Sequence, residues 1–210
     1  MYSDGPIRTY LEHAASGRPT PGGGSVSALV GALGAAMACM AANFTVGRRK
    51  FRDVEPRCAA ILARCEASWR ALLDLTDADT QAYAQVSAAY GSAKDTPEQQ
   101  TARTQAIQQA LRAAMDVPLR ALRVCETIAR DLEELADIAN PNLLSDVGVA
   151  AIHALAGLRG CKLNVEVNLA SIDDTEFVAC HRREIDAAEA RAGAVCEKVL
   201  AKVAATIWKT

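Results

Sequence analysis

Residues 20–50 read TPGGGSVSALVGALGAAMACMAANFTVGRRK, and the rest of the chain is understood most easily from this stretch. Three consecutive glycines open it, no charged residue occurs from Ser25 to Val46, and a basic cluster closes it. Small residues recur at helical spacing, which lets a second helix approach closely across a core or a subunit interface. These residues are Ser27, Gly31, Gly34, Ala35, Ala38, Ala41 and Ala42. The pattern predicts a buried central helix.

A membrane span is the main alternative for this segment, because its length would suffice and the basic cluster resembles a cytoplasmic flank. About half of its residues are Gly, Ala or Ser, however, and these are only weakly favourable in hydrocarbon. The other predicted helices are amphipathic, as in a bundle that folds in water. We therefore favour the buried helix and expect no membrane partner.

The composition indicates a helical protein of the cytoplasm. Half of the 210 residues are apolar but only 4% are aromatic, and alanine is abundant. Alanine is the best helix former and buries little area, so its core depends on close helix approach. The 23 basic and 25 acidic residues are interspersed, which gives no reason to expect a nucleic-acid partner. The N-terminus lacks a basic segment followed by an apolar run, so we expect no signal peptide and a cytoplasmic location.

Helical periodicity runs along the whole chain, and no sustained alternation typical of strands occurs. Pro118 is expected to kink or restart one helix. The absence of a repeat or linker predicts one domain over residues 1–210, an all-α antiparallel bundle with a small-residue-rich central helix. The predicted helices cover residues 7–15, 25–49, 55–90, 96–138, 143–171 and 175–208.

Asp79 is out of place on the third predicted helix. Apolar residues follow steps of three and four along this helix, and Asp79 falls on their stripe, whereas Asp77 falls on the polar side and is expected to be solvated. A buried carboxylate is costly unless it is paired or hydrogen-bonded. One interpretation is a structural aspartate bonded to a helix end or an arginine. The other is an acid or base whose pKa is raised by burial.

Polar residues also interrupt the apolar pattern of residues 143–171. Ser145 and Asp146 lie in the opening turn, where they either cap the helix or point into a site. Asn164 and Asn168 lie one turn apart between apolar flanks, which suggests a buried amide network or ligand contacts. His153 shares their line and is more typical of a satisfied core histidine than of a ligand.

The glycine-rich turn and the basic cluster are weak signals by themselves. PGGGS matches neither the P-loop nor the dinucleotide fingerprint, although its backbone N–H groups, with Ser25 as cap, could hold an anion or a polar ligand edge. The cations after the central helix stabilise its C-terminus in any case. Three scattered histidines and seven cysteines without a CxxC pair predict no metal site.

Five segments together carry a family resemblance. PTPGGGS, ANFTVGRRKF, DADTQAYAQV, NLLSDVGVAA and GLRGCKLNVEVN resemble the cyclodeaminase/cyclohydrolase family, named for the C-terminal domain of formiminotransferase-cyclodeaminase. The similarity runs from about residue 4 to residue 205. It implies an all-helical homodimer that acts on tetrahydrofolate one-carbon adducts, with no cofactor beyond the folate substrate.

The chain most resembles the stand-alone methenyltetrahydrofolate cyclohydrolases of bacterial one-carbon metabolism. The resemblance therefore implies reversible hydrolysis of 5,10-methenyltetrahydrofolate to 10-formyltetrahydrofolate. Two alternatives stay open: a formiminotetrahydrofolate cyclodeaminase that releases ammonia, and a non-catalytic folate-binding helical protein.

The resemblance also assigns site residues. Asp79 would be the general base, and Lys50 would polarise water or relay a proton. Arg48 and Arg49, which replace the family's usual lysines, would attract the glutamate carboxylates. The pterin edge would be held by Asp146 and two asparagines of the 140–142 turn. The full predicted substrate-binding set is Gly22, Gly23, Gly24, Ser25, Asn43, Arg48, Arg49, Asn140, Asn142, Ser145, Asp146 and Asn164.

Overall fold

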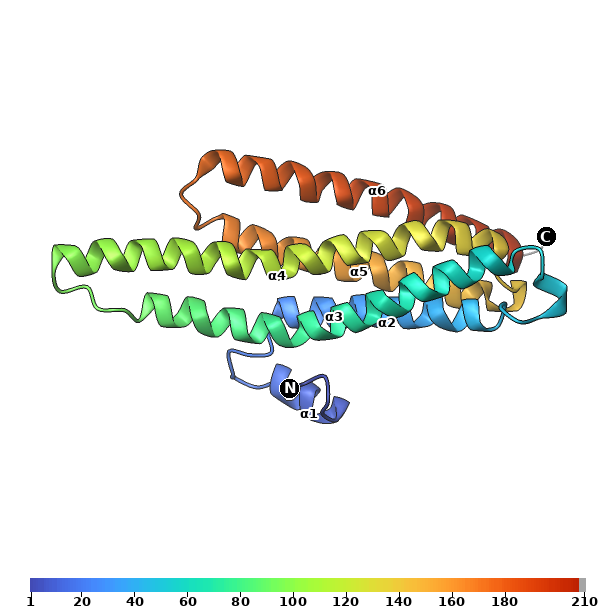
Figure 1. The fold of residues 1–210 in the computed structure, drawn as a ribbon, viewed down its shortest axis with the longest axis horizontal. Coiled ribbons are helices and arrows are strands. Elements are labelled where there is room, and N and C mark those ends of the chain that lie inside the picture. Colours follow the sequence, from blue (N-terminus) through green and yellow to red (C-terminus); the bar gives the residue numbers. More distant parts are fainter. Residues whose placement is uncertain (208–210) are drawn as a thin grey trace.

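The computed structural model describes residues 1–207, which form six α-helices and two short 3-10 turns and no strand (Figure 1). The predicted all-α class is confirmed. The elements are α1 (Ile7–Ala14), α2 (Gly23–Asn43), η1 (Arg49–Phe51), α3 (Glu55–Tyr90), α4 (Pro97–Ile138), η2 (Pro141–Leu143), α5 (Leu144–Leu169) and α6 (Thr175–Ile207).

Helix α2 is the centre of the bundle and contacts α3, α4 and α5. Its small residues let α5 lie against it in the antiparallel direction. An added Cβ at Gly157 would lie 2.8 Å from the backbone nitrogen of Gly31, and one at Gly34 would lie 2.9 Å from that of Ala154. Backbone therefore meets backbone along this pair, as the spacing of small residues predicted.

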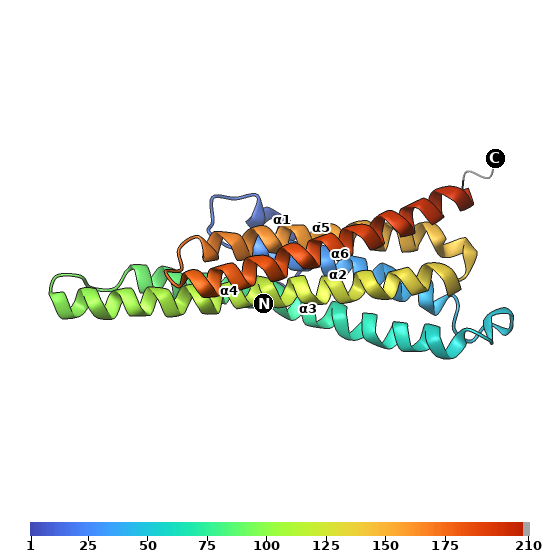
Figure 2. The same cartoon turned by 90° about the horizontal axis from the view of Figure 1, so that it is seen from above.

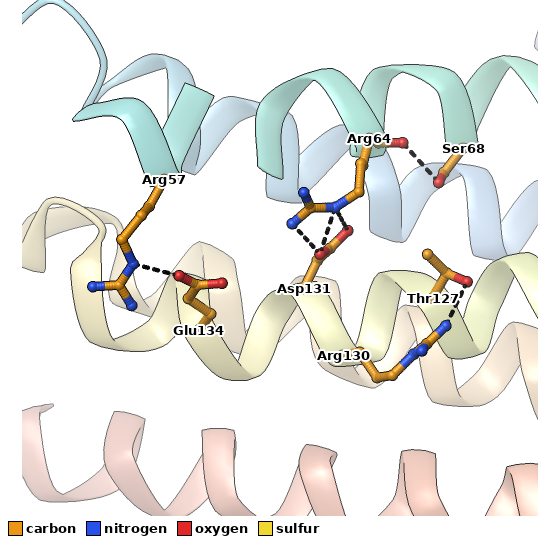
Figure 3. A network of polar contacts seen from close by, with 7 residues as sticks. All are labelled: Arg57, Arg64, Ser68, Thr127, Arg130, Asp131 and Glu134. Atoms are coloured by element: carbon orange, nitrogen blue, oxygen red, sulfur yellow. Dashed lines mark hydrogen bonds and ion pairs between the residues drawn. The ribbon is translucent and has the colours of Figure 1, made fainter. Parts of the chain in front are cut away.

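The two longest helices, α3 and α4, form a hairpin that projects beyond the ends of α2, α5 and α6 (Figures 1 and 2). Thr96 starts α4 with a capping box that Gln99 completes. Arg64 of α3 makes a bidentate ion pair with the buried Asp131 of α4, with its closest approach at 2.6 Å (Figure 3). Such pairing has a fixed geometry, so it helps to hold the register of the hairpin.

The last helix is fixed to α4 by a row of ion pairs. Arg123 pairs with Glu184 at 2.7 Å, and Lys198 pairs with Glu133 at 2.8 Å. Most of these groups are exposed, so each pair contributes little on its own and the row mainly specifies alignment. The apolar face of α6 supplies the burial that stabilises the contact.

Several details differ from the sequence predictions. The central helix ends at Asn43 rather than near residue 49, because the chain turns through Gly47, whose φ of 74° suits glycine. Helix α4 continues through the buried Pro118 without restarting. Asp77 is 6% exposed rather than solvated, because it accepts hydrogen bonds from the backbone of residues 2 and 3. The end predicted at residue 208 lies outside the described residues.

Two segments are long and apolar enough to cross a membrane by length and composition alone, namely α2 and residues 141–169. Only the first was singled out from the sequence. In the apolar window of α2, 61% of the residues are buried inside the bundle, and core helices of soluble proteins pass the same test. The fold thus gives α2 neighbours that account for much of its apolar character.

Candidate active site

A cavity of about 420 Å³ opens where the projecting hairpin leaves the rest of the bundle. Its walls come from α3, α4, the C-terminal part of α5 and the loop before α2. The lining residues are Pro19, Thr20, Gly22, Gly23, Asp79, Ala82, Tyr83, Val86, Tyr90, Leu111, Ala114, Asn164, Val167, Asn168 and Ser171. Four of the predicted site residues line it, namely Gly22, Gly23, Asp79 and Asn164.

Asp79 lies at the inner end of this cavity, against the N-terminus of α2. Its Oδ2 atom accepts a hydrogen bond of 2.9 Å from the backbone nitrogen of Ser25. Burial raises the pKa of Asp79, and the hydrogen bond from Ser25 opposes that shift. The prediction of an aspartate bonded to a helix end is therefore confirmed, and the same carboxylate also faces the cavity.

Gly23 and Gly24 lie in the first turn of α2 rather than in a turn before it, and side chains from other helices occupy the space beside them. An added Cβ at Gly24 would lie 2.1 Å from Oδ1 of Asp79, and one at Gly23 would lie 3.2 Å from the Asn164 amide. The N-cap residue Gly22 has no side chain that could cap α2, so the first N–H groups of the helix need a polar partner from elsewhere. Asp79 is that partner, and it also benefits from the positive end of the helix dipole.

Tyr10 supports this arrangement, although no sequence pattern singled it out. Its hydroxyl lies 3.0 Å from Oγ of Ser25, and both residues are buried. Ser25 therefore does not cap α2 with its side chain. Its hydroxyl contacts Tyr10 of α1, and its backbone N–H donates to Asp79. The sequence shows a tyrosine on the short helix before the glycines, but its burial against Ser25 is seen only in the structure.

Only part of the polar line of α5 faces the cavity. Asn164 and Asn168 line the cavity, and each donates its amide to a backbone carbonyl one turn earlier. His153 lies about three turns nearer the N-terminus of α5, outside the cavity, with its Nδ1 atom 2.8 Å from the carbonyl oxygen of Val149. It is only half-buried, so the prediction of a core histidine is wrong.

The remaining predicted residues gather at the opposite end of α2. This helix has 21 residues, so its two ends lie about 30 Å apart. Lys50 is exposed there and its ammonium lies 5.6 Å from the ring centre of Phe51. We call this group the Lys50 end; it comprises Asn43, Arg48, Arg49, Lys50, Asn140, Asn142, Ser145 and Asp146. One chain does not bring it to Asp79.

Contacts within the Lys50 end are mainly structural. The backbone nitrogen of Asn140 donates to Oγ1 of Thr45 at 2.8 Å, and its side chain accepts from the backbone of Asn142. No side chain caps α5, so the capping interpretation of Ser145 and Asp146 is wrong. The side chain of Ser145 is exposed and that of Asp146 is half-buried.

A family model described as formiminotransferase-cyclodeaminase matches residues 6–187. The chain belongs to this family. The resemblance drawn from the sequence motifs is thereby confirmed.

Known relatives cover most of the chain. A methenyltetrahydrofolate cyclohydrolase from Methylorubrum extorquens is 41% identical over 193 residues, which are 92% of this chain and 93% of that protein. The formimidoyltransferase-cyclodeaminase of Rattus norvegicus is 36% identical over 87% of this chain, which spans only 34% of the rat protein. The crystal structure of a formiminotetrahydrofolate cyclodeaminase from Thermotoga maritima superposes with a TM-score of 0.89 at 32% identity, over 99% of this chain and 100% of that one.

Metal-binding side chains do not cluster in the part of the chain that the structure describes. No group of three or more His, Cys, Asp or Glu residues within residues 1–207 is arranged to hold a metal ion. Six of the seven cysteines are buried and free, and only Cys180 is exposed. Burial raises the pKa of Cys39 to about 11, so this thiol stays protonated at neutral pH.

Proposed function

We propose that this protein hydrolyses 5,10-methenyltetrahydrofolate to 10-formyltetrahydrofolate. The observation that carries the proposal is Asp79, a partly buried carboxylate with a raised pKa in a cavity, without an arginine or lysine paired to it within residues 1–207. The similarity to a methenyltetrahydrofolate cyclohydrolase over 92% of the chain supports it.

The chemistry follows from the charge of the substrate. The bridging carbon of methenyltetrahydrofolate belongs to a cationic amidinium-like group, which an anionic carboxylate attracts. Asp79 takes the proton of a water molecule as that water adds to the carbon. The bond from the carbon to N5 then breaks, N5 receives a proton, and the formyl group stays on N10. One water is consumed and one proton is released overall.

The direct test follows methenyltetrahydrofolate by its absorbance, with and without the protein. We expect enzyme-dependent loss of absorbance and formation of 10-formyltetrahydrofolate. Unchanged decay in the presence of folded protein would contradict the proposal and leave a folate-binding protein.

A cyclodeaminase is the second candidate, because the Thermotoga maritima structure superposes over 99% of this chain. That reaction expels ammonia from 5-formiminotetrahydrofolate and yields the same methenyl cation, so the same carboxylate would suit both. Release of ammonia from the formimino substrate, without hydrolysis of the methenyl compound, would favour this candidate.

The protein is further proposed to act as a homodimer through one face of α2 and α5. Large apolar side chains remain exposed along this face, and α2 contributes no charge to it. These side chains are Val26, Leu33 and Met40 of α2, Phe44 just after it, and Val149, Ile152, Leu163 and Val167 of α5. An apolar patch of this length in water is typical of an interaction surface.

A two-fold axis near the middle of α2 would also complete the site. The α2 helices of the two copies would then run antiparallel to each other. The Lys50 end of each chain would therefore lie near Asp79 of the other chain. This arrangement reconciles the predicted pairing of Asp79 and Lys50 with their separation in one chain. Val167 belongs both to this face and to the cavity wall, so a partner would cover the edge of the cavity.

Leu33→Glu tests this assembly, because Leu33 lies at the centre of α2 and is 50% exposed. A buried unpaired carboxylate at the interface is expected to shift sedimentation from dimer to monomer and to abolish most of the activity. Leu11→Glu on α1 is the matched control, since Leu11 is 59% exposed but lies outside the face. A wild-type monomer at micromolar concentration would overturn the dimer.

A further inference from the structure

The cavity extends from Asp79 toward the tip of the projecting hairpin, along one face of α3. Tyr83, Val86 and Tyr90 line it in succession, and the helix rises about 16 Å from residue 79 to residue 90. Both tyrosines are 48% exposed. Their rings are one heptad apart and therefore lie on the same side of α3. The site is thus an elongated groove with an aromatic outer half.

Arg103 lies at the outer end of this groove. Its Nη2 atom donates to the backbone carbonyl of Tyr90 at 2.9 Å, and its guanidinium carbon lies 5.9 Å from the centre of the Tyr90 ring. It stands on the same stripe of α4 as Leu111 and Ala114, which line the opposite wall. Arg103 is therefore at the level where the groove ends.

The guanidinium of Arg103 has hydrogen-bond donors without a partner. Within residues 1–207 its Nη1 atom makes no hydrogen bond and no carboxylate forms an ion pair with it, while its Nε atom is enclosed and also has no partner. Arg112, two to three turns further along α4, differs because it pairs with Asp174 at 2.9 Å. Unpaired buried donors are costly, and a planar guanidinium with free donors favours a carboxylate.

The order of groups along the groove mirrors the order of groups in a folate. An anionic carboxylate stands at the inner end, tyrosine rings follow, and a cation stands at the outer end. A methenyltetrahydrofolate presents a cationic ring system, then a benzoyl ring, then glutamate carboxylates. Charge and shape are thus complementary along the whole length.

We infer that Arg103 binds the carboxylates of the substrate's glutamate tail and that Tyr83 and Tyr90 flank its benzoyl ring. This inference rests on the proposed function for the identity of the substrate. It places the tail subsite on the α3–α4 hairpin of the chain that supplies Asp79. Arg48 and Arg49, which the family resemblance predicts to attract the tail, belong to the Lys50 end and would reach this site only from the second copy of the proposed dimer.

Arg103→Met tests the inference, because methionine keeps an unbranched apolar stem and removes the guanidinium. Calorimetry would measure binding of tetrahydrofolate and of tetrahydropteroate, which lacks only the glutamate. We expect the variant to bind tetrahydrofolate about tenfold or more weakly than wild type, since hydrogen bonds to charged groups contribute that much to affinity. Its affinity for tetrahydropteroate should be unchanged. With the methenyl substrate, KM should rise while kcat stays unchanged.

Two comparison variants sharpen the test. Arg130→Met on α4 removes an exposed arginine whose one side-chain hydrogen bond within residues 1–207 goes to Thr127, and the variant is expected to bind both ligands as wild type does (Figure 3). Arg48→Met/Arg49→Met addresses the other basic group. Loss of the preference for glutamate in this double variant, and not in Arg103→Met, would overturn the inference.

The binding assay separates this inference from the proposed function. Wild-type protein that binds tetrahydrofolate through Arg103 but hydrolyses no methenyl substrate would refute the function alone. Equal weakening of both ligands by Arg103→Met, or equal affinity of wild-type protein for both, would refute the tail subsite alone.

Discussion

Replacing Asp79 with asparagine is expected to lower kcat for methenyltetrahydrofolate hydrolysis by about 10²–10⁴-fold, the usual contribution of a general base. The carboxamide is nearly the same size and its oxygen can still accept the hydrogen bond from the backbone of Ser25. A neutral group also costs less to bury, so the melting temperature should not fall. Steady-state kinetics on the folded variant would measure the effect.

The pH dependence gives an independent check on Asp79. A base must be deprotonated to act, so kcat/KM should rise as pH increases through the pKa of the carboxyl group. Because burial raises that pKa, the rise should lie above the ordinary aspartate value of 3.8. Asp79→Asn should remove this rise of kcat/KM with pH. Asp74→Asn changes an exposed residue of the same helix and should preserve both the pH dependence and the value of kcat/KM. If Asp79→Asn kept the wild-type kcat, Asp79 would not be the general base.

Gly157→Ala is expected to destabilise the protein by about 3 kcal/mol, near the upper end for overpacking. The added methyl group would lie 2.8 Å from the nitrogen and 2.9 Å from the Cα of Gly31, and neither backbone atom can move without shifting α2 from α5. For a domain of this size the melting temperature should fall by roughly 10 °C. Thermal unfolding followed by circular dichroism would measure it.

Gly193→Ala is the matched control for that substitution. Gly193 also lies inside a helix, but nothing stands within 4 Å of its added Cβ. Alanine there should raise stability by about 0.5–1 kcal/mol, because it restricts the unfolded chain. If both variants unfolded at the same temperature, close packing of α2 on α5 would not be what the glycines provide.

The local pattern determined the helices of this protein. Charge-free residues at small-residue spacing predict a buried helix at α2, and steps of three and four predict the other long helices, because burial of one face repeats every 3.6 residues. The same periodicity exposes Asp79 as a polar residue on an apolar stripe. Helix ends are less well determined, since the end at Asn43 depends on how the following loop packs.

Burial of Asp77 required the tertiary structure. Two residues before Asp79 it falls on the polar side of α3, and only the N-terminal segment folding over that side covers it. Tyr10 likewise acquires its role only when α1 lies beside Ser25. Contacts between residues that are far apart in the sequence produce no periodic pattern, so they cannot be predicted from the sequence in this way.

The three glycines at residues 22–24 mark where sequence and tertiary structure divide. The sequence by itself predicted a glycine turn before an apolar helix that starts at Ser25, together with the carboxylate of Asp79 on a later helix. In the structure the helix already begins at Gly23, so two of the three glycines lie in its first turn. Only the tertiary structure decided that this carboxylate occupies the space a side chain at Gly24 would fill. It also separated Lys50 from Asp79 by the length of α2, because a straight helix cannot bring its own two ends together.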